Sequence, residues 1–312
     1  MDYICGITFA PFVPGSVLCS KESKESFIQM VERTKANFVI FVPTGLQQTA
    51  CSETIFMGKE SVNEEELTEM IRFAKEQGLK VALKPTVNCK DGTWRAHIHF
   101  FDEDVPCEPK WSNWFESYTK FQLRFAKVAE ETGCEMFIPG CEMVMSEHRE
   151  EEWRKLIADI RKVYHGLIAY NTDKYQEHNV KWWDAVDVIA SSGYYPIDKW
   201  ESELDRIEAV VKKYKKPFFF AEAGCMSTKG SNLVPNDWSI QDESDPDGQA
   251  EWYSAMFKAC EKRSWIKGFA LWDWGARLYC ERDIDRKRGY ELYLKPAEKV
   301  VREYYEKHTG KV

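Results

Sequence analysis

The sequence has no long hydrophobic segment. No run of 18 apolar residues occurs in its 312 residues, so a membrane-spanning helix is not expected. The N-terminal segment, MDYICGITFAPF, also lacks the basic stretch and the long apolar stretch of a secretion signal. These two absences lead us to expect a cytoplasmic protein that does not associate with a membrane.

The ten cysteines form no recognisable framework, and no CxxC pair is present. This excludes the usual zinc-ribbon and thioredoxin-like patterns. Half of the cysteines lie within apolar runs, namely Cys5, Cys134, Cys141, Cys225 and Cys260. We therefore expect buried, reduced thiols, as is usual for cytoplasmic proteins.

Common signatures of cofactor-dependent, metal-dependent and serine-dependent enzymes are missing. No GxGxxG turn, HExxH pair or GxSxG elbow occurs, and the chain has six histidines. His97 and His99 form an HxH pair, which keeps a metal hydrolase open as an alternative, but neither a metal nor a cofactor is expected. The net charge of −8 argues against a nucleic-acid partner, which would require a basic face.

The chain instead repeats one pattern, a short apolar run followed by a longer amphipathic run. The apolar runs, which predict strands buried on both faces, are 3–12, 38–43, 80–85, 135–140, 167–170, 188–191, 217–221 and 266–272. The amphipathic runs, which predict helices, are 23–35, 63–77, 114–132, 150–164, 200–214, 248–263 and 296–308. Ser23 is expected to cap the first helix, and Asn63, with Glu66 three residues later, the second. The helix expected after the fifth strand is the weakest and lies around 181–186.

Eight strand–helix units predict a parallel sheet that closes into a (β/α)8 barrel, the TIM-barrel fold. A doubly wound open sheet is the competing arrangement, but the glycine-rich turn it requires is absent after the first strand, where Pro11 and Pro14 stand. A chain of this length suits one such barrel, so residues 1–312 are expected to form a single domain. We expect this domain to be a monomer.

Two glutamates stand where the site of such a barrel forms, at the carboxyl ends of the strands. Glu142 follows the fourth strand in PGCEM, and Glu222 follows the seventh in FFFAEAGC. Strands four and seven face each other across a barrel mouth. Hydrolysis of a glycosidic bond uses such a pair, in which one carboxyl is protonated and the other is ionised. The two glutamates are therefore the candidate catalytic residues.

Further polar and aromatic residues follow the same strand ends and are candidate substrate contacts. They are Lys84, Asn88, Trp94, Arg95, Asn171, Tyr194, Tyr195, Trp272 and Trp274. Either of the two tyrosines could donate a hydrogen bond to an ionised Glu222, and Trp272 could form the floor under a sugar ring. The chain has 12 tryptophans, and four more are candidate sugar platforms, namely Trp111, Trp114, Trp182 and Trp183.

Several segments taken together resemble a known family. They are LKPTVNCKDGTWRAHI (83–98), WFESYTKF (114–121), IPGCEM (138–143), WRKLIADIRKVYHG (153–166), SGYYP (192–196), KPFFFAEAGC (216–225), GFALWDW (268–274) and KPAEKVVREYY (295–305). With these segments the chain resembles glycoside hydrolase family 113, one of the retaining (β/α)8 hydrolases, over nearly its whole length. The resemblance implies a β-1,4-mannanase that acts on mannan, glucomannan or mannooligosaccharides.

The resemblance also implies roles for individual residues. It makes Glu142 the acid/base and Glu222 the nucleophile of a double displacement. The positions that match substrate contacts of the family are Lys84, Asn88, Trp94, Arg95, Tyr195 and Trp272.

The chain departs from the family at positions beside the glutamates. Cys141 stands where the family usually has Thr, AEAGC replaces a segment like TEIGY, and Gly45 precedes Gln47 where a Trp is usual. These changes spare both glutamates but alter the sugar subsites. A β-linked gluco- or xylo-oligosaccharide therefore stays open as the substrate, and an inactive carbohydrate-binding barrel stays open as a non-enzymatic alternative.

Overall fold

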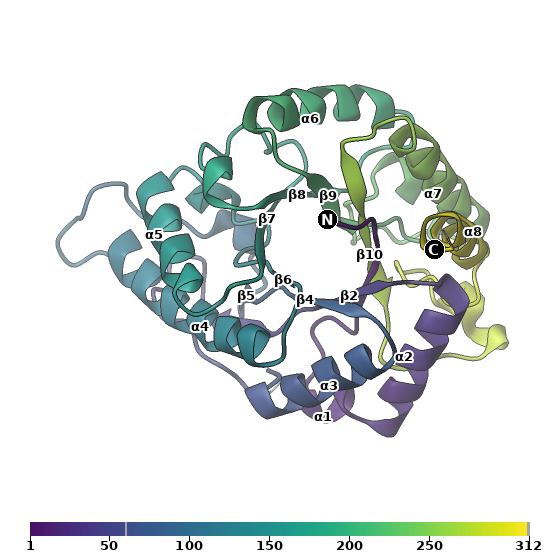
Figure 1. Ribbon diagram of the computed structural model, residues 1–312, viewed down its shortest axis with the longest axis horizontal. Helices are drawn as coiled ribbons and strands as arrows, with labels where there is room; N and C mark the ends of the chain where they lie inside the picture. The colour runs from purple at the N-terminus through teal and green to yellow at the C-terminus, as the bar shows by residue number, and fades with distance from the viewer. Residues whose placement is uncertain (60, 311–312) are drawn as a thin grey trace.

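The chain forms a closed barrel of eight parallel strands (Figure 1). The computed structural model describes residues 1–59 and 61–310. The barrel strands are β1 (Ile4–Phe9), β2 (Phe38–Phe41), β4 (Lys80–Leu83), β6 (Met136–Phe137), β7 (Leu167–Thr172), β8 (Val188–Gly193), β9 (Phe218–Ala223) and β10 (Ile266–Trp274). Each strand pairs with its neighbours in chain order, and β10 closes the barrel on β1. The predicted (β/α)8 fold is confirmed.

Helices surround the barrel on its outside, as Figure 1 shows. The longer ones are α2 (Lys21–Thr34), α3 (Glu64–Glu76), α4 (Trp111–Glu131), α5 (Glu150–Arg161), α6 (Trp200–Tyr214), α7 (Pro246–Cys260) and α8 (Pro296–Thr309). The shorter ones are α1 (Gly15–Leu18) and the 3-10 turns η1 (Arg95–His97), η2 (Val144–Ser146), η3 (Trp183–Ala185), η4 (Ser231–Leu233) and η5 (Glu281–Arg286). No helix in the described ranges is long and apolar enough to cross a membrane.

The starts of the first two long helices show how local sequence sets a helix boundary. Asn63 and Glu66 form the expected capping box, in which each side chain accepts from the backbone N–H of the other residue. The predicted cap at Ser23 is wrong. Ser20 is the cap, and its hydroxyl oxygen accepts from the backbone N–H of Ser23 at 3.2 Å. Ser23 itself is the third residue of α2 and is fully buried.

Several expected elements end earlier than predicted, and two of them are reduced to two or three residues. The helix expected around residues 181–186 is only the turn η3 (Trp183–Ala185), because Trp182 and Trp183 are both buried and so short a segment cannot support a helix. The fourth strand, β6, ends at Phe137 instead of residue 140. Pro139 follows closely and has no N–H to donate to a sheet.

A two-stranded parallel sheet, which the sequence did not predict, extends the barrel wall. It consists of β3 (Thr44–Gln47) and β5 (Thr86–Cys89). Each continues a barrel strand beyond a proline, Pro43 after β2 and Pro85 after β4. These prolines interrupt the ladder, and the chain resumes its pairing one step later. This small sheet carries Asn88 to the rim of the barrel.

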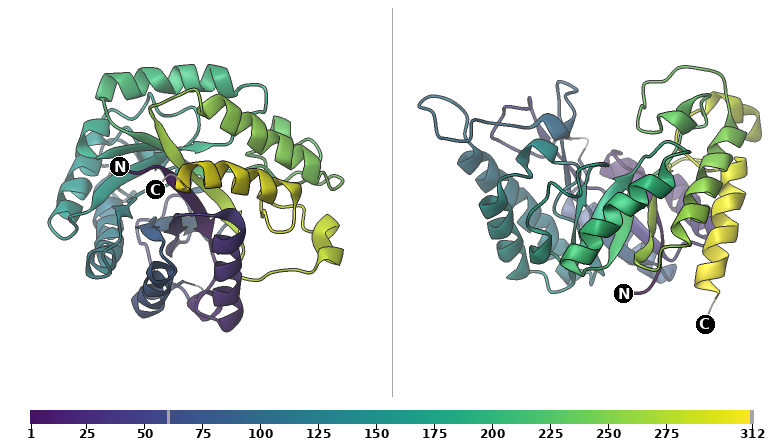
Figure 2. Two further views of the ribbon diagram at one scale, coloured as in Figure 1. Left: turned by 45° about the vertical axis from the view of Figure 1, so that its right-hand side comes forward. Right: turned by 90° about the horizontal axis from the view of Figure 1, so that it is seen from above.

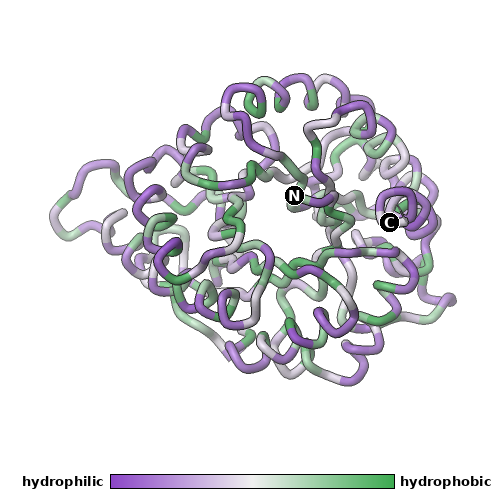
Figure 3. Tube along the Cα trace, viewed as in Figure 1, coloured by the Kyte–Doolittle hydropathy of each residue, from purple (hydrophilic) through white to green (hydrophobic). Residues whose placement is uncertain are grey.

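The core has two layers, one inside the barrel and one between the barrel and its helices. The inner layer consists of strand residues with alternating large and small side chains, such as Phe38, Ile40, Ala82 and Phe219. Figure 3 shows the apolar residues of the strands gathered in the ring and the hydrophilic residues on the outer helix surfaces. In the right-hand view of Figure 2, both termini lie at one end of the barrel and long loops extend from the other end.

Candidate functional site

A cavity of about 880 Å³ opens among the loops at the carboxyl ends of the strands. It is lined by aromatic and polar side chains, and both candidate glutamates reach it. The lining residues are Phe12, Asn88, Cys89, Gly92, Thr93, Trp94, Arg95, Glu142, Asp173, Lys174, Tyr194, Glu222, Val234, Asn236, Asp237, Trp238, Ser239, Trp272 and Tyr290. A second depression of about 550 Å³ lies against α3 and has mostly charged walls, but it contains neither glutamate.

The backbone places the two glutamates differently. Glu222 belongs to β9, where it lies opposite Ser192 of β8. Glu142 lies beyond β6 in a turn, has a φ of 55°, and donates its backbone N–H to the carbonyl of Asn171 at 2.8 Å. A positive φ is unusual for a residue with a side chain and is found most often where function constrains the backbone. The turn directs the Glu142 side chain into the barrel mouth.

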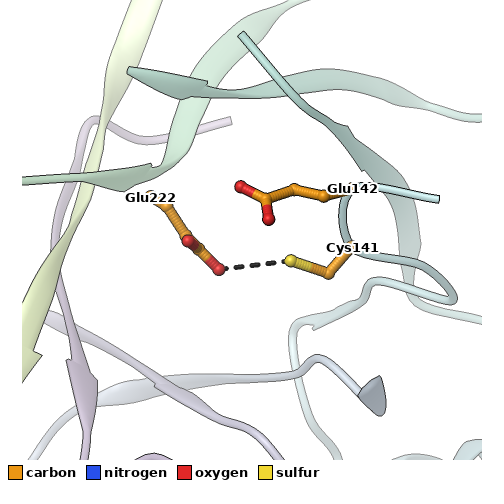
Figure 4. A group of neighbouring side chains, drawn as sticks. All are labelled: Cys141, Glu142 and Glu222. Atoms are coloured by element: carbon orange, nitrogen blue, oxygen red, sulfur yellow. Dashed lines mark hydrogen bonds between the residues drawn. The ribbon is translucent and has the colours of Figure 1, made fainter. Parts of the chain in front are cut away.

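The two carboxyl groups lie face to face, with Cys141 beside them (Figure 4). One oxygen of Glu142, one oxygen of Glu222 and the sulfur of Cys141 all lie within 4.8 Å of one another. Retaining glycosidases hold their two carboxyl groups about 5–5.5 Å apart, whereas inverting enzymes leave about 6.5–9.5 Å for a water molecule. The nearest oxygens of this pair lie closer together than the carboxyl groups of an inverting enzyme, as expected for the retaining arrangement.

Glu222 is held by donors on both carboxylate oxygens. Its Oε1 accepts from the Lys84 ammonium and from the Cys141 thiol, the latter at 3.2 Å, and its Oε2 accepts from the Tyr194 hydroxyl at 2.9 Å. Burial tends to raise the pKa of Glu222, but the positive charges of Lys84 and Arg95 and these hydrogen bonds outweigh burial and lower it below its usual value. Glu222 is therefore ionised at neutral pH.

The surroundings of Glu142 stabilise its ionised form less than the surroundings of Glu222 do. Its Oε1 accepts from the Ser192 hydroxyl at 2.8 Å, and its Oε2 accepts from the indole N–H of Trp94 at 3.1 Å and from Arg95 at 3.4 Å. Burial raises the pKa of Glu142, and the negative charge of Glu222 raises it further, while Arg95 and Ser192 oppose this only in part. Glu142 thus keeps its proton to a higher pH than an ordinary glutamate does.

These opposite shifts separate the two carboxyls into an acid and an anion. A pair of neighbouring carboxyls whose environments push their pKa values apart is the usual basis for assigning acid and base roles. Glu142 can donate a proton, and Glu222 can attack as a nucleophile or stabilise positive charge. Together they can perform acid-assisted displacement at a single carbon atom lodged between them.

A chain of buried hydrogen bonds links the two glutamates. Lys84 donates to the amide oxygen of Asn171 at 3.2 Å, and the Asn171 amide nitrogen donates to the Ser192 hydroxyl at 3.1 Å. Ser192 in turn donates to Glu142. Lys84 and Asn171 are fully buried and do not line the cavity. Lys84 and Asn171 therefore orient the carboxyls. This corrects the expectation that these two residues contact the substrate directly.

Arg95 is fixed by three oxygen acceptors on three different residues. Its guanidinium donates to the Val87 carbonyl at 3.2 Å, to the Asn88 side chain at 2.8 Å and to Glu142 at 3.4 Å. Asn88 therefore lies at the cavity as expected, and it also orients Arg95. A guanidinium held in this way keeps a fixed positive charge beside the acid carboxyl.

The structure shows which of two neighbouring tyrosines, left as alternatives by the sequence, donates a hydrogen bond to Glu222. Tyr194 lines the cavity and donates to Glu222, whereas Tyr195 points away and donates to Glu177 at 2.7 Å. Tyr195 is fully buried and cannot contact a molecule in the cavity. This corrects the expectation that Tyr195 binds substrate. Adjacent residues of β8 and its extension face opposite sides, so only one of the two can reach the barrel mouth.

The structure also shows which of the candidate tryptophans line the cavity and which are buried in the core. Trp94 and Trp272 line the cavity as expected. Trp274 is fully buried and donates its indole N–H to Ser26 of α2 at 3.0 Å, so its expected substrate contact is corrected to a packing role. The same holds for four tryptophans that were candidate platforms and are buried in the helix layer, namely Trp111, Trp114, Trp182 and Trp183.

Several cavity residues were not expected from the sequence. Trp238 lies on the rim with 64% of its surface exposed, and its ring centroid is 6.3 Å from that of Trp94. Phe12 also lines the cavity, with its ring centroid 5.6 Å from that of Trp272. Lys174 and Tyr290 are further lining residues that were not expected. A tryptophan in the polar segment PNDWS was the one signal that could have predicted Trp238.

The described part of the chain contains a single group of side chains close enough to share a metal ion, Cys141, Glu142 and Glu222. The carboxylate oxygens already accept hydrogen bonds from Lys84 and Arg95, and burial raises the pKa of the Cys141 thiol well above its usual value. A neutral thiol and two cation-paired carboxyls do not make a good cation site. His97 and His99 are exposed and take no part in this group.

The barrel and its carboxyl pair define the class of protein as a glycoside hydrolase. The chain belongs to Glycoside Hydrolase Family 113, whose family model matches residues 7–295. The resemblance drawn from sequence segments is confirmed. No curated protein matches the chain.

Solved structures of the same family are very similar to this chain. A GH113 β-1,4-mannanase, solved as a complex, is 53% identical with a TM-score of 0.96, covering 98% of this chain and 99% of that one. A GH113 β-mannanase from Alicyclobacillus acidocaldarius, in complex with ManMIm, is 39% identical with a TM-score of 0.94 and 98% coverage of both chains. A β-glucuronidase from Ruminococcus gnavus is 15% identical with a TM-score of 0.65 over 98% of this chain and 50% of that one, which shows a common fold alone.

Proposed function

We propose that this glycoside hydrolase cleaves β-1,4-linked mannan, glucomannan or mannooligosaccharides with retention of configuration, through Glu222 as nucleophile and Glu142 as acid/base. The observation that carries the proposal is the pair itself. Two carboxyls within reach of one sugar carbon have pKa values shifted in opposite directions by their surroundings.

In the first step the ionised carboxylate of Glu222 attacks the anomeric carbon. The bond from that carbon to the leaving oxygen breaks, and Glu142 gives its proton to that oxygen. The products are a shortened sugar chain and a glycosyl ester on Glu222. Lys84 and Tyr194 hold Glu222 on both oxygens, so little reorganisation is needed before attack.

In the second step water replaces the enzyme at the same carbon. Esterification has removed the negative charge of Glu222, so the main neighbouring charge that raised the pKa of Glu142 is gone. Glu142 then ionises readily, takes a proton from water, and the hydroxide so formed attacks the anomeric carbon. The ester bond breaks and Glu222 leaves as a carboxylate, which restores both groups.

The choice of mannose as the sugar is supported by the family and by the similar structures. Two GH113 structures described as β-mannanases match this chain over at least 98% of its length. The cavity offers flat aromatic faces in Trp94, Trp238 and Trp272, which suit the apolar faces of pyranose rings. The departures at Cys141 and Ala221 lie beside the nucleophile, so the sugar nearest the cleavage point is where selectivity must be measured.

The test is a product analysis on mannohexaose, with cello- and xylohexaose in parallel. We expect cleavage of the mannan series. The first product should be the β-anomer, which NMR can detect before mutarotation mixes the two anomers. Preferred cleavage of a gluco- or xylo-oligosaccharide would overturn the sugar assignment, and initial formation of the α-anomer would overturn the double displacement. The product lengths also tell internal cutting from trimming of chain ends.

Two variants test the nucleophile in the same assay. Glu222→Ala should lose turnover even with an activated aryl mannoside, because the carboxylate that forms the ester is gone. Glu147→Gln is the matched control. Glu147 is a buried carboxyl outside the cavity whose pKa is raised to about 8 by burial, so its amide replaces a group that is already neutral. This control should keep activity near the wild-type level.

We further propose that the chain acts as a monomer, since every group of the carboxyl pair and its support comes from one chain. Light scattering coupled to size exclusion at assay concentration is the measurement, and a stable dimer would contradict it.

A further inference from the structure

Two charged neighbours on the cavity wall, Asp173 and Lys174, have no part in the double displacement proposed above. They follow β7, whose end lies beside the turn that carries the acid. Cys141 bridges to Asn171, and the backbone N–H of Glu142 donates to the Asn171 carbonyl. Asp173 and Lys174 are therefore attached to the backbone that fixes Glu142.

Lys174 is held in place by an anion and by aromatic rings. Its Nζ lies 3.4 Å from Oδ2 of Asp173, 5.9 Å from the ring centroid of Trp94 and 5.8 Å from that of Tyr175. The side chains of Lys174 and Asp173 are only 12% and 9% exposed. A lysine so enclosed is not a mobile surface charge, and its ammonium has a defined position over the indole face.

The indole beneath Lys174 is the one that binds the acid carboxyl. The N–H of Trp94 donates to Oε2 of Glu142 at 3.1 Å. A cation over an aromatic face draws electron density from the ring, and hydrogen bonds in a buried chain polarise one another, so the N–H becomes a stronger donor. We propose that Asp173 and Lys174 form a positioning pair for Glu142, in which Asp173 holds Lys174 over Trp94 and Lys174 acts on Glu142 through the indole.

The charges around this chain of contacts support the direction of the effect. Burial and the charge of Glu142 together raise the pKa of Asp173 to about 7, against the lowering effect of Lys174. Asp173 in turn helps to raise the pKa of Glu147 and of Tyr175. The other charged groups that act on Glu142 are Glu222, Arg95 and Lys84.

The inference uses the acid/base role of Glu142 from the proposed function, and it predicts a pattern that a merely structural role would not produce. Loss of Lys174 should weaken acid assistance to a poor leaving group and leave a good leaving group unaffected. With Lys174→Met we expect kcat/KM on mannotetraose to fall about tenfold, a part of the 10²–10⁴-fold that general acid catalysis contributes. The same variant should change kcat/KM on a dinitrophenyl β-mannobioside by less than about twofold.

A double-mutant cycle tests whether the effect passes through the indole. Trp94→Phe keeps an aromatic face and removes the N–H. In that background Lys174→Met should cause no further loss on mannotetraose, because the group that transmits its effect is gone. Lys174→Arg should retain most activity, and Lys181→Met, at an exposed lysine outside the cavity, is the matched control. Additive losses, or equal losses on both substrates, would overturn the proposal.

A titration of Glu142 gives a readout that does not depend on turnover. With carbon-13-labelled glutamate carboxyls, NMR should show the pKa of Glu142 rising in Lys174→Met and falling in Asp173→Asn, since one variant removes a positive charge and the other a negative one. Shifts of the same sign, or no shift, would overturn the inference even if mannosides were not the substrate. Failure of the wild-type protein to cleave any mannoside would count against the proposed function alone.

Discussion

Lys84 and Glu222 form an ion pair that is almost wholly shielded from solvent, with side chains 0% and 7% exposed. The pair joins the residue that follows β4 to β9 across the barrel mouth. Burial alone would favour the neutral form of Glu222, so Lys84 is the main reason that this carboxyl is a ready nucleophile. Removing one partner of such a pair leaves an uncompensated buried charge.

The variant Lys84→Met tests this relationship through the pH profile. Wild-type activity requires ionised Glu222 and protonated Glu142, so kcat/KM should be bell-shaped, with one limb below and one above the ordinary glutamate pKa of 4.5. Glu222 has a lowered pKa, so activity is lost as the pH falls through that pKa. Without Lys84 the acidic limb should move up by about one to three pH units. Lys80→Met, at a half-exposed position at the start of β4, should leave the limb in place.

The variant Glu142→Ala separates the acid role from the base role. Substrates with poor leaving groups should lose the most, about 10²–10⁴-fold in kcat/KM, because their departure needs a proton. Activated aryl mannosides should form the glycosyl-enzyme almost normally and then accumulate it. Added azide should restore turnover of these substrates and yield the β-mannosyl azide. An equal loss on all substrates, without rescue, would contradict the assignment.

Cys141 occupies a position at which its thiol donates to Oε1 of Glu222 across 3.2 Å. Cys141→Ala removes this donor, and kcat/KM should fall on the order of tenfold, or about 1.4 kcal/mol, near the lower end for a hydrogen bond to a charged group. Cys141→Ser keeps a donor and should remain within a few-fold of wild type. Cys260→Ala, equally buried but in α7, serves as the control for loss of a thiol. Equal losses in the alanine and serine variants would indicate packing rather than hydrogen bonding.

Trp238 is an exposed aromatic platform on the cavity rim. Trp238→Ala should raise KM for mannohexaose about tenfold, which corresponds to roughly 1.4 kcal/mol of lost binding. The activity on a short aryl mannoside should change little, since it does not reach the rim. Phe101→Ala is the matched control, because Phe101 is also exposed and does not line the cavity. A KM that stays unchanged for the long substrate would remove Trp238 from the binding surface.

Much of the fold could be predicted because strands and helices of a barrel are local features. Apolar runs and helix caps act over a few residues, so the eight barrel strands and the capping box at Asn63 were recognised correctly. The errors had both local and tertiary causes. Pro139 shortened β6, and the buried pair Trp182 and Trp183 left only a turn where a helix was expected.

The site residues, too, include some that could be predicted from local sequence and some that could not. That Glu142 and Glu222 would come together followed from strand order, since parallel strands all end at one mouth of the barrel. Which tyrosine reaches Glu222, and which tryptophans face the cavity, did not follow. Tyr194 and Tyr195 differ by one residue and point to opposite sides, and Trp274 lies only two residues from Trp272 yet enters the core.

The sequence by itself thus determined the barrel, the glutamate pair and the family, because each depends on spacing along the chain. The resemblance to the family implied which carboxyl is the acid, and only the tertiary structure shows why Glu142 holds a proton while Glu222 is ionised. That difference comes from the attraction between Lys84 and Glu222 and from the repulsion between Glu222 and Glu142. These residues are far apart in sequence, and their charges act strongly because the fold brings them together and excludes water.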